Sequence, residues 1–408
     1  MQPVVPHGVG VNDADENDET TALQGMYNSP PINTHVVFEA ATNVEDGTPA
    51  PAPPPPPSPP PQLRMSARVQ AFVLKNFLPL GFGFVLILSL SCPGPGAAVG
   101  KIKVLDGIGL VQAINNMVVF FISGVTLETK HALAAVKQGR SLAVGLVAIL
   151  LLTPCIGFAL RYLPFRPSDF TLGLTIFTVV PTTLGVGVAL TVASKGNEAL
   201  ALLLTVSTNL LGIFTVPLLL QAILSASGAL QFDTATLVAK LIVTILVPSV
   251  LGSVLRRASP AATKWVTAHR TFLSLLSTSN LICIIWQTLS TAAPTLLAQN
   301  AGDVMIVVAS SLIYHLLLLA LMYVLTLYVI RLPVRDRVAV IIMAAQKSAP
   351  VAVTVISYMT TDTARQGLLA IPGLIGQLAQ IFVGAAVTKT LSNMIKRETE
   401  AEEAANAP

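Results

Sequence analysis

The feature that most constrains this chain is a succession of long apolar runs that begins at about residue 64. Many of the runs approach about 20 residues, the length at which an α-helix crosses a hydrocarbon core of about 30 Å. Only 11% of the residues are charged, against about 25% in an ordinary soluble domain. A soluble enzyme is therefore excluded. The sequence predicts an all-α polytopic membrane protein.

By this length criterion, the sequence predicts ten transmembrane helices. They lie near Phe77–Ser91, Gly107–Leu127, Ser141–Leu163, Phe170–Ser194, Asn197–Leu224, Ala235–Leu255, Thr271–Ala292, Asp303–Ile330, Val338–Tyr358 and Leu368–Leu391. They form one predicted domain, residues 64–397, which an acidic C-terminal tail follows at residues 398–408.

The positions of Lys and Arg give an independent check on this topology. Of the 24 basic residues, 17 fall on the side that holds both predicted termini and 6 on the opposite side, while Lys347 lies inside a predicted span. Lys and Arg accumulate on the cytoplasmic side of membrane proteins. The bias predicts an even number of crossings, with both termini on the cytoplasmic-type side.

The N-terminal residues 1–63 have a different composition. They contain eight acidic residues and no Lys or Arg, and ten of the thirteen residues from Pro49 to Pro61 are proline. We expect a disordered tail that ends in a stiff polyproline II spacer. The alternative is a Pro-rich ligand for an SH3 or WW partner. No signal or transit peptide is recognisable at this end.

The two halves of the membrane domain resemble one another. Motifs of the first half, about residues 70–225, recur in the second, about residues 235–392, at offsets of 164 to 169 residues. Five helices per repeat is an odd number, so the second copy must be inverted. Inverted repeats with helices broken at matching positions are a signature of secondary transporters. The motif pairs are Leu78-Pro79 with Val247-Pro248, Pro181-Thr182-Thr183 with Gln346-Lys347-Ser348, and Leu210-Leu211-Gly212 with Leu374-Ile375-Gly376.

The fourth predicted span contains the first break, at Pro181, Thr182 and Thr183, with Gly185 and Gly187 close behind. Proline removes a backbone donor and the glycines weaken the helix, which frees carbonyl and amide groups within the membrane. These groups could bind a cation at one half-helix end and an anion at the other. The alternative is a packing kink in which the two threonines bond to their own helix.

The ninth predicted span contains the second break, at Gln346, Lys347 and Ser348. Lys347 lies ten residues after Arg337, about 15 Å of helical rise and hence near mid-depth. A charge there costs about 2.5–3.5 kcal/mol on the insertion scale. Three roles are open: a structural lysine held by carbonyls, an anchor for an anionic substrate, or a replacement for a coupling cation.

Polar side chains in the fifth and tenth spans complete the candidate site. Thr205, Ser207, Thr208 and Asn209 fall within five residues, and Gln377 and Gln380 share one helix face. Other intramembrane polar residues are interpreted as interhelical hydrogen-bond partners: Gln112, Asn115, Asn116 and His315. Glu198 is expected at the membrane edge, with a cation path as the alternative. No residue is predicted to be catalytic, since no span carries an acid pair or metal-ligand spacing.

Several motifs of the chain are similar to those of the bile acid:sodium symporter family, especially its plant and algal plastid branch of sodium/metabolite cotransporters. The resemblance covers about residues 70–392. It is carried by Pro181-Thr182-Thr183-Leu184, Gly187–Thr191, Gly196-Asn197, Ala199–Leu202, Ser207, Asn209–Gly212, Ser123–Leu127, Leu152–Pro154, Val247-Pro248 and the Gln346-Lys347-Ser348 run before Pro350.

The resemblance implies a ten-helix fold with a panel domain and a core domain, and sodium bound where two broken helices cross. By position, Thr182, Thr183, Thr208, Asn209 and Gln346 would be sodium ligands, with Ser348 beside them. The chain departs from the family pattern at both breaks. Gly185-Val186 and Ala344-Ala345 replace serines, and Ile342 replaces a glutamate. A hard cation needs about six oxygens, so these losses weaken the expectation of two bound sodium ions.

The sequence thus predicts a secondary transporter of a small organic anion or metabolite, coupled to sodium or another cation, without an organic cofactor. The alternatives are a sodium-independent or proton-coupled carrier in which Lys347 replaces an ion, and a non-transporting regulator that acts through its tail. Membrane lipids and the organic anion are the expected partners, and nucleic acid is not. The resemblance suggests the plastid envelope, with the plasma membrane or an endomembrane as alternatives.

Overall fold

The computed structural model describes residues 69–70, 72–74, 77–103, 109–126, 139–183, 185–225 and 232–405. The N-terminal tail expected at residues 1–63 lies outside them. Within the described ranges the regular elements are helices, and two isolated β-bridges occur between segments outside them. The helices are α3 (Phe77–Ser91), α4 (Pro93–Gly100), α5 (Leu110–Thr126), α7 (Gly139–Val147), η2 (Ala148–Leu152), α8 (Thr153–Leu160), α9 (Ser168–Val179), α10 (Val186–Ala193), α11 (Glu198–Ser225), α12 (Thr234–Leu241), η3 (Ile242–Leu246), α13 (Val247–Ala258), α14 (Pro260–Ala268), α15 (Arg270–Leu297), α16 (Ala301–Val324), η4 (Leu325–Val329), α17 (Val334–Ala345), α18 (Ala349–Met359) and α19 (Thr363–Ala405).

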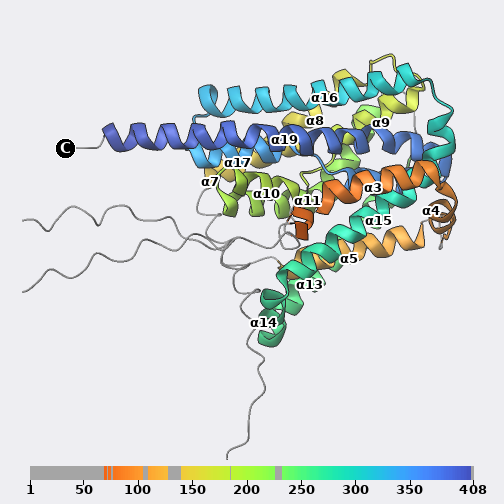
Figure 1. The fold of residues 1–408 in the computed structure, drawn as a ribbon, viewed down its shortest axis with the longest axis horizontal. Helices are drawn as coiled ribbons and strands as arrows, with labels where there is room; N and C mark the ends of the chain where they lie inside the picture. The colour runs from red at the N-terminus through yellow and green to blue at the C-terminus, as the bar shows by residue number, and fades with distance from the viewer. Residues whose placement is uncertain are drawn as a thin grey trace, which may run out of the picture. The chain divides into compact units, whose positions relative to one another are not determined.

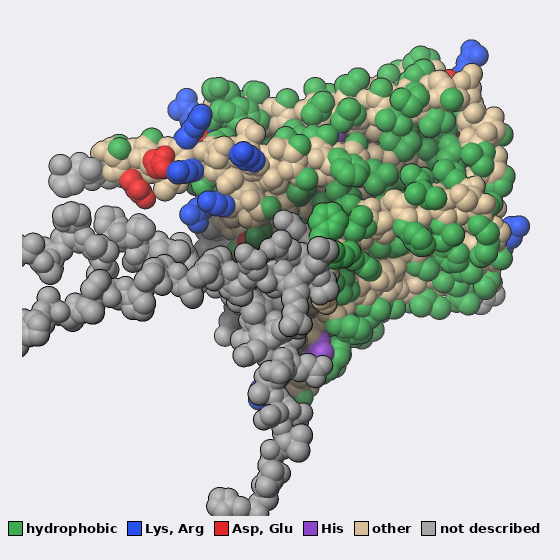
Figure 2. Space-filling model, viewed as in Figure 1, with side chains coloured by type: hydrophobic (Ala, Val, Ile, Leu, Met, Phe, Trp, Pro, Cys, Tyr) green, Lys and Arg blue, Asp and Glu red, His purple; other side chains and the backbone are tan. Residues whose placement is uncertain are grey.

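Six of the described helices are long and apolar enough to cross a membrane, or seven if the bent pair α3 and α4 counts as one span. The prediction of a polytopic, all-helical membrane protein is therefore confirmed. Hydrophobic side chains cover much of the visible face of this membrane domain, and Lys and Arg gather near its two ends (Figure 2). The six are Gly139–Leu160, Glu198–Leu224, Thr234–Ala258, Arg270–Leu297, Ala301–Val329 and Thr363–Ala405.

The C-terminal helix is longer than the span predicted at Leu368–Leu391, because α19 continues through the acidic segment to Ala405. Two ion pairs stabilise the extension. The Arg337 guanidinium lies 2.7 Å from a carboxylate oxygen of Glu398, and Lys396 lies 3.6 Å from Glu400 one turn further along α19. The acidic residues that the sequence assigns to a tail are thus helical as far as residue 405.

The helices of the membrane domain pack in two groups (Figure 1). The first contains α3, α4, α5, the α12–α13 helix and α15. Within this group α5 and α13 approach most closely: a Cβ atom on Gly124 of α5 would lie 2.1 Å from the carbonyl oxygen of Ser249 of α13. A side chain at this position would separate the two backbones.

The second group contains α7–α8, α9–α10, α11, α16, α17–α18 and α19. Here Gly173 lets α9 approach α19, since a Cβ atom on it would lie 2.1 Å from the carbonyl oxygen of Leu369. The two groups meet along α15 and α19, where Gly367 packs against Ala292.

A π-helical turn in the α7–α8 helix leaves one backbone carbonyl, that of Ile149, available as a hydrogen-bond acceptor. In η2, the N–H of Thr153 donates to the carbonyl of Ala148, five residues back. The next residue is Pro154, which has no N–H to donate. The carbonyl of Ile149 is therefore left without a backbone donor, and the Thr153 hydroxyl donates to it at 3.0 Å. Turns of this kind are frequent at functional sites.

A capping aspartate starts the α12–α13 helix. The side chain of Asp233 accepts hydrogen bonds from the backbone N–H groups of Ala235 and Thr236. The hydroxyl of Thr236 also donates to it, and these bonds hold the pKa of the Asp233 carboxyl below its ordinary value. The carboxylate thus satisfies two of the donors that a helix N-terminus leaves unpaired.

Candidate functional site

Both interruptions predicted from the sequence are present. The helix α9 ends at Val179 and α10 begins at Val186, while α17 ends at Ala345 and α18 begins at Ala349. The intervening residues that the structure describes are buried, apart from the exposed Gly185. Four half-helix ends therefore meet inside the protein, each with backbone groups that lack a partner in their own helix.

The two interruptions pair with each other. Thr182 and Lys347 form an antiparallel β-bridge. The N–H of Thr183 donates to the carbonyl of Gln346 at 3.2 Å, and the N–H of Ser348 donates to the carbonyl of Pro181 at 3.1 Å. Each extended segment thus satisfies backbone groups of the other, which non-helical backbone at membrane depth requires. We call this pairing of residues 181–183 with residues 346–348 the crossing.

Hydroxyl groups cap the two half-helices that leave the crossing. The Thr183 hydroxyl accepts from the N–H groups of Val186 and Gly187 at 3.1 and 3.4 Å, at the start of α10. The Ser348 hydroxyl accepts from the N–H of Val351 at 3.5 Å, at the start of α18. Both side chains therefore act locally: Ser348 is the N-cap of α18, and Thr183, two residues before the N-cap Gly185 of α10, accepts from N–H groups of its first turn. Both half-helices direct their positive ends toward the crossing.

Lys347 lies at the crossing and is fully buried. Its ammonium donates to the carbonyl of Ile149 at 3.1 Å and to the carbonyl of Val180 at 3.0 Å. The first acceptor is the carbonyl freed by Pro154. The second belongs to Val180, the C-cap of α9, at the end where the helix dipole is negative. In the part of the chain that the structure describes, no carboxylate pairs with Lys347. Two carbonyl dipoles hold this cation.

Side-chain amides from α11 and α19 support the crossing. The Asn209 amide donates to the carbonyl of Thr182 at 3.1 Å and to that of Thr205 at 2.8 Å. On the other side, the side-chain oxygens of Gln380 and Gln377 accept from the N–H groups of Lys347 and Ala349, at 2.8 and 3.1 Å. The amide of Gln346 donates back to the carbonyl of Gln380 at 2.9 Å. The helices that correspond to the fifth and tenth predicted spans thus each form hydrogen bonds with one interruption: α11 with residues 181–183 and α19 with residues 346–348.

The three other predicted site residues of α11 make no hydrogen bond to the crossing among the described residues. The hydroxyl of Thr205 donates to the carbonyl of Ala201, and that of Thr208 lies 3.4 Å from the carbonyl of Thr205. Ser207 is half-buried. Serine and threonine in membrane helices often bond to their own backbone. Of the polar cluster on α11, Asn209 is the side chain that reaches the crossing.

Several buried polar atoms around the crossing have no hydrogen-bond partner among the described residues. Three are oxygens, from Thr182, Asn209 and Gln346, and two are amide nitrogens, from Gln377 and Gln380. A buried polar group left without a partner costs about 1–3 kcal/mol. Five such atoms, from four segments, thus offer hydrogen-bonding or ligating groups at the crossing.

Of the four other intramembrane polar residues expected to be interhelical partners, Asn116 and His315 form such contacts. The Asn116 amide donates to the Thr354 hydroxyl at 2.7 Å, which joins α5 to α18. A ring nitrogen of the buried His315 lies 3.1 Å from the carbonyl of Ala345, the last residue of α17. Gln112 and Asn115 each keep a buried amide nitrogen without a partner among the described residues. Glu198 is exposed in the first turn of α11.

One buried acid was missed by sequence reasoning. Asp336 accepts from the hydroxyl of Ser141 at 2.6 Å and from the amide of Asn197 at 2.7 Å, and so joins α17 to α7 and to the residue before α11. Its position between Arg335 and Arg337 marks it as a loop charge in the sequence. Only the fold shows that it is buried.

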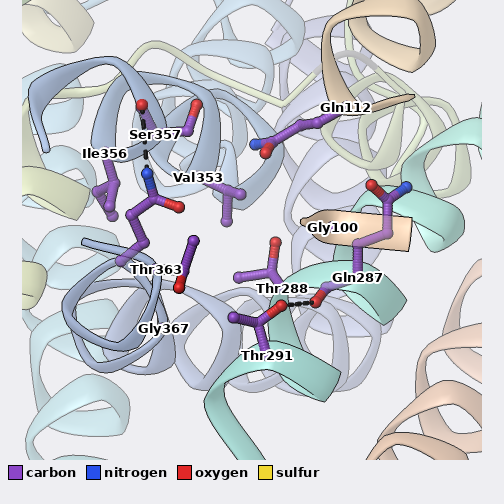
Figure 3. Close-up of a pocket in the computed structure, with 11 residues that line it drawn as sticks. Gly100, Gln112, Gln287, Thr288, Thr291, Val353, Ile356, Ser357, Thr363 and Gly367 are labelled. Carbon is purple, nitrogen blue, oxygen red and sulfur yellow. Dashed lines mark hydrogen bonds between the residues drawn. The ribbon is translucent and has the colours of Figure 1, made fainter. Parts of the chain in front are cut away.

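A small cavity lies between the two helix groups, away from the crossing (Figure 3). It measures about 30 Å³, and a cavity needs about 10–15 Å³ by this measure to hold one water molecule. Among the described residues that line it, none is charged, and the polar ones include Gln112, Gln287, Thr288, Thr291 and Gln366. The cavity therefore suits water or a polar group rather than a whole organic solute.

A polytopic helical protein whose two broken helices cross at a buried polar centre has the features of a secondary transporter. The comparison with known proteins agrees. The model of the SBF-like CPA transporter family matches residues 76–393, and the chain belongs to this family of transporters rather than to an enzyme family. The resemblance proposed from the sequence is thereby confirmed.

Two groups of relatives illustrate the similarity. The chain is 31% identical over 332 residues to the "Probable sodium/metabolite cotransporter BASS4, chloroplastic" of Arabidopsis thaliana, a match that covers 80% of this chain and 74% of the relative. It is also 31% identical to the protein of the same description from Oryza sativa subsp. japonica, over 79% of this chain and 77% of the relative. The "Sodium/bile acid cotransporter 7-A" of Xenopus laevis is 26% identical, over 69% and 82%.

Proposed function

We propose that this protein is a secondary active transporter of a small organic anion, in which Lys347 fills one of the cation positions at the crossing. On this view sodium coupling is reduced to at most one ion. The observation that carries the proposal is the Lys347 ammonium, which two carbonyl oxygens hold at 3.1 and 3.0 Å beside the end of α9. Exposed carbonyls at such a half-helix end suit a cation, whether it is an ion or a tethered ammonium.

The remaining oxygens fit one further cation. Thr182, Asn209 and Gln346 each have a buried oxygen without a partner among the described residues. Hard cations bind oxygen ligands, typically about six, so three neutral oxygens leave the rest to backbone, water or substrate. The donor set therefore fits one sodium ion better than two.

An anionic substrate suits the other half-helix ends. The N-termini of α10 and α18 begin next to the crossing, and helix N-termini attract anions. Lys347 has its ammonium on two carbonyls, which favours its role as a cation replacement over its role as a direct substrate anchor. The descriptions of the relatives, which name bile acid and metabolite as cargo, support a solute of this class.

The transport cycle we propose is alternating access, in ten spans arranged as two inverted five-helix repeats. The matching breaks support this arrangement, as do the supporting amides on α11 and α19. One helix group would move against the other while the crossing stays intact, because its backbone groups depend on each other. The chloroplast location printed for the plant relatives supports a plastid envelope location, which a fluorescent fusion imaged with plastid and plasma-membrane markers would test.

Sodium binding to the purified protein tests the proposal without knowledge of the substrate. We expect the wild type to bind at most one ²²Na⁺ per chain in a scintillation-proximity titration. Lys347→Gln, which removes the ammonium and adds an amide oxygen, should bind one more. Binding of two sodium ions by the wild type would contradict the proposal. A thermal-shift screen of organic anions, with and without sodium, would then identify the substrate class, since a ligand that binds the native state stabilises it.

A further inference from the structure

The connection between the α12–α13 helix and α15 forms a basic elbow, which we define as residues 256–270. The helices on both sides, Thr234–Ala258 and Arg270–Leu297, are long enough to span a membrane. The nine residues of α14 lie between them, at the tip where α13 ends and α15 begins (Figure 1). A short helix between two consecutive spans must lie at a membrane surface.

The charge of the elbow has one sign. Arg256, Arg257, Lys264 and Arg270 fall within it, and the chain has no Asp or Glu between Asp233 and Asp303. Among the residues that the structure describes, Arg257 and Lys264 are exposed and have no hydrogen-bond or ion-pair partner. Arg257 and Lys264 therefore present exposed positive charge, without a partner among the described residues, at the depth of lipid headgroups.

The orientation of α14 is fixed by packing. Val266 is buried against Ile122 and Val125 of α5 and Leu273 of α15. Ser259 caps the helix by accepting from the N–H of Ala262 at 3.1 Å, and Pro260 follows at the first helical position. The helix is thus packed on one apolar face, and Ala261, Lys264, Trp265 and Ala268 of its other face are exposed.

The exposed face combines aromatic, basic and apolar groups. Trp265 is 49% exposed and stacks on His269, with 4.6 Å between ring centroids. Leu251 and Val254 of α13 and Phe272 of α15 are exposed beside the elbow. Tryptophan is enriched at membrane interfaces, and clusters of Lys and Arg next to a span attract anionic lipids. An apolar flank, an interfacial ring and basic groups are the pattern that a lipid molecule matches.

We infer that the basic elbow binds anionic phospholipid headgroups of the surrounding leaflet, through Arg257 and Lys264 and with Trp265 at the interface. The binding anchors the helix group of α5, α13 and α15 while the other group moves. The inference does not depend on the identity of the transported solute.

The fluorescence of Trp265 in nanodiscs tests this inference. The chain has two tryptophans, so Trp286→Phe leaves Trp265 as the reporter. The nanodiscs contain phosphatidylcholine with a minority of phosphatidylglycerol, and either one or the other lipid carries brominated chains. The composition stays constant, and only the identity of the quenching lipid changes. We expect brominated phosphatidylglycerol to quench, per mole of lipid, about twofold or more better than brominated phosphatidylcholine.

Two variants in the same background make the test specific. Arg257→Gln with Lys264→Gln should lower this quenching ratio to about one, and Lys264→Gln alone gives the same comparison if the double variant aggregates. The matched control is Lys101→Gln, which removes an exposed positive charge far from the elbow. Its neighbour Gly100 packs on Thr291, about 30 Å along α15 from the elbow. The Lys101→Gln variant should leave the quenching ratio unchanged.

Three results would overturn the inference. Equal quenching by the two lipids in the single-tryptophan protein would show no headgroup preference. A preference that survives in the double variant would remove Arg257 and Lys264 from the site. A preference that appears only after deletion of residues 1–62 would show that the acidic tail, rather than lipid, occupies the elbow of the full chain.

Discussion

Lys347 is a charged residue deep within an apolar run, and its sequence position alone does not show what its ammonium binds. Its depth in an apolar run was enough to identify it as costly and therefore as a candidate site residue. The sequence left three roles open. The acceptors of its ammonium, the carbonyls of Ile149 and Val180, come from two other segments, one of which exposes its carbonyl because of a proline five residues later. No local pattern around Lys347 carries this information.

Asn209 is the residue of α11 whose loss should matter most. Asn209→Ala removes the donor to the carbonyl of Thr182 at the crossing and leaves a buried acceptor, which should lower the free energy of unfolding by about 1–3 kcal/mol. Ser207→Ala, two residues earlier and half-buried, should change it by less than about 0.5 kcal/mol. Thermal unfolding in detergent measures both. Equal effects of the two variants would show that the Asn209 contact does not stabilise the crossing.

At the scale of the element, the π-helical turn η2 links a proline to the site. Pro154→Ala adds an N–H that can donate to the carbonyl of Ile149 or Leu150, and it relieves the cost of proline within a helix, about 3 kcal/mol. We expect a more stable protein with slower transport, because the new N–H competes with Lys347 for the Ile149 carbonyl. Melting temperature and uptake by proteoliposomes measure the two effects.

The same arrangement elsewhere in the chain provides the control. In η3 the N–H of Val247 also donates five residues back, to Ile242, and Pro248 follows, but no lysine binds there among the described residues. Pro248→Ala should therefore stabilise the protein and leave the rate of transport unchanged. A loss of transport in both variants would indicate that the two kinks matter for helix shape rather than for the Lys347 site.

The contact between α5 and α13 gives a prediction about packing. Gly124→Ala places a Cβ atom where Ser249 already has its carbonyl, at 2.1 Å, and overpacking of this kind costs about 1–3 kcal/mol. Gly83→Ala in α3 meets nothing within 4 Å and should be neutral, or stabilising by about 0.5–1 kcal/mol. A comparison of the two melting temperatures tests the prediction, which fails if Gly124→Ala melts at or above the wild-type temperature.

At the scale of the whole molecule, the hydrogen bond between Asn116 and Thr354 joins the two helix groups. If one group moves against the other, this contact must break during transport. In a chain whose three cysteines are replaced, Asn116→Cys with Thr354→Cys should therefore stop uptake when the pair is bridged by a short thiol cross-linker. Each single cysteine variant serves as control and should remain active under the same treatment. Full uptake in the cross-linked protein would exclude this relative motion.

The N-terminal tail distinguishes a transporter from a regulator. Deletion of residues 1–62 removes the acidic and Pro-rich segment but none of the residues at the crossing. We expect the remaining chain to bind sodium and to transport as the full chain does. Loss of the protein's effect on cells together with unchanged sodium binding would instead favour the alternative of a tail-dependent regulator.

The sequence by itself determined the helical class, the apolar segments and the two interruptions, because these depend on local hydrophobicity and on proline and glycine. It also singled out Lys347, Asn209, Gln377 and Gln380, since polar groups in apolar runs are costly wherever they lie. Tertiary structure alone decided their partners. The pairing of Thr182 with Lys347, the carbonyls that hold the ammonium and the burial of Asp336 join segments more than a hundred residues apart. Such contacts depend on how helices cross, and the local sequence does not encode that geometry.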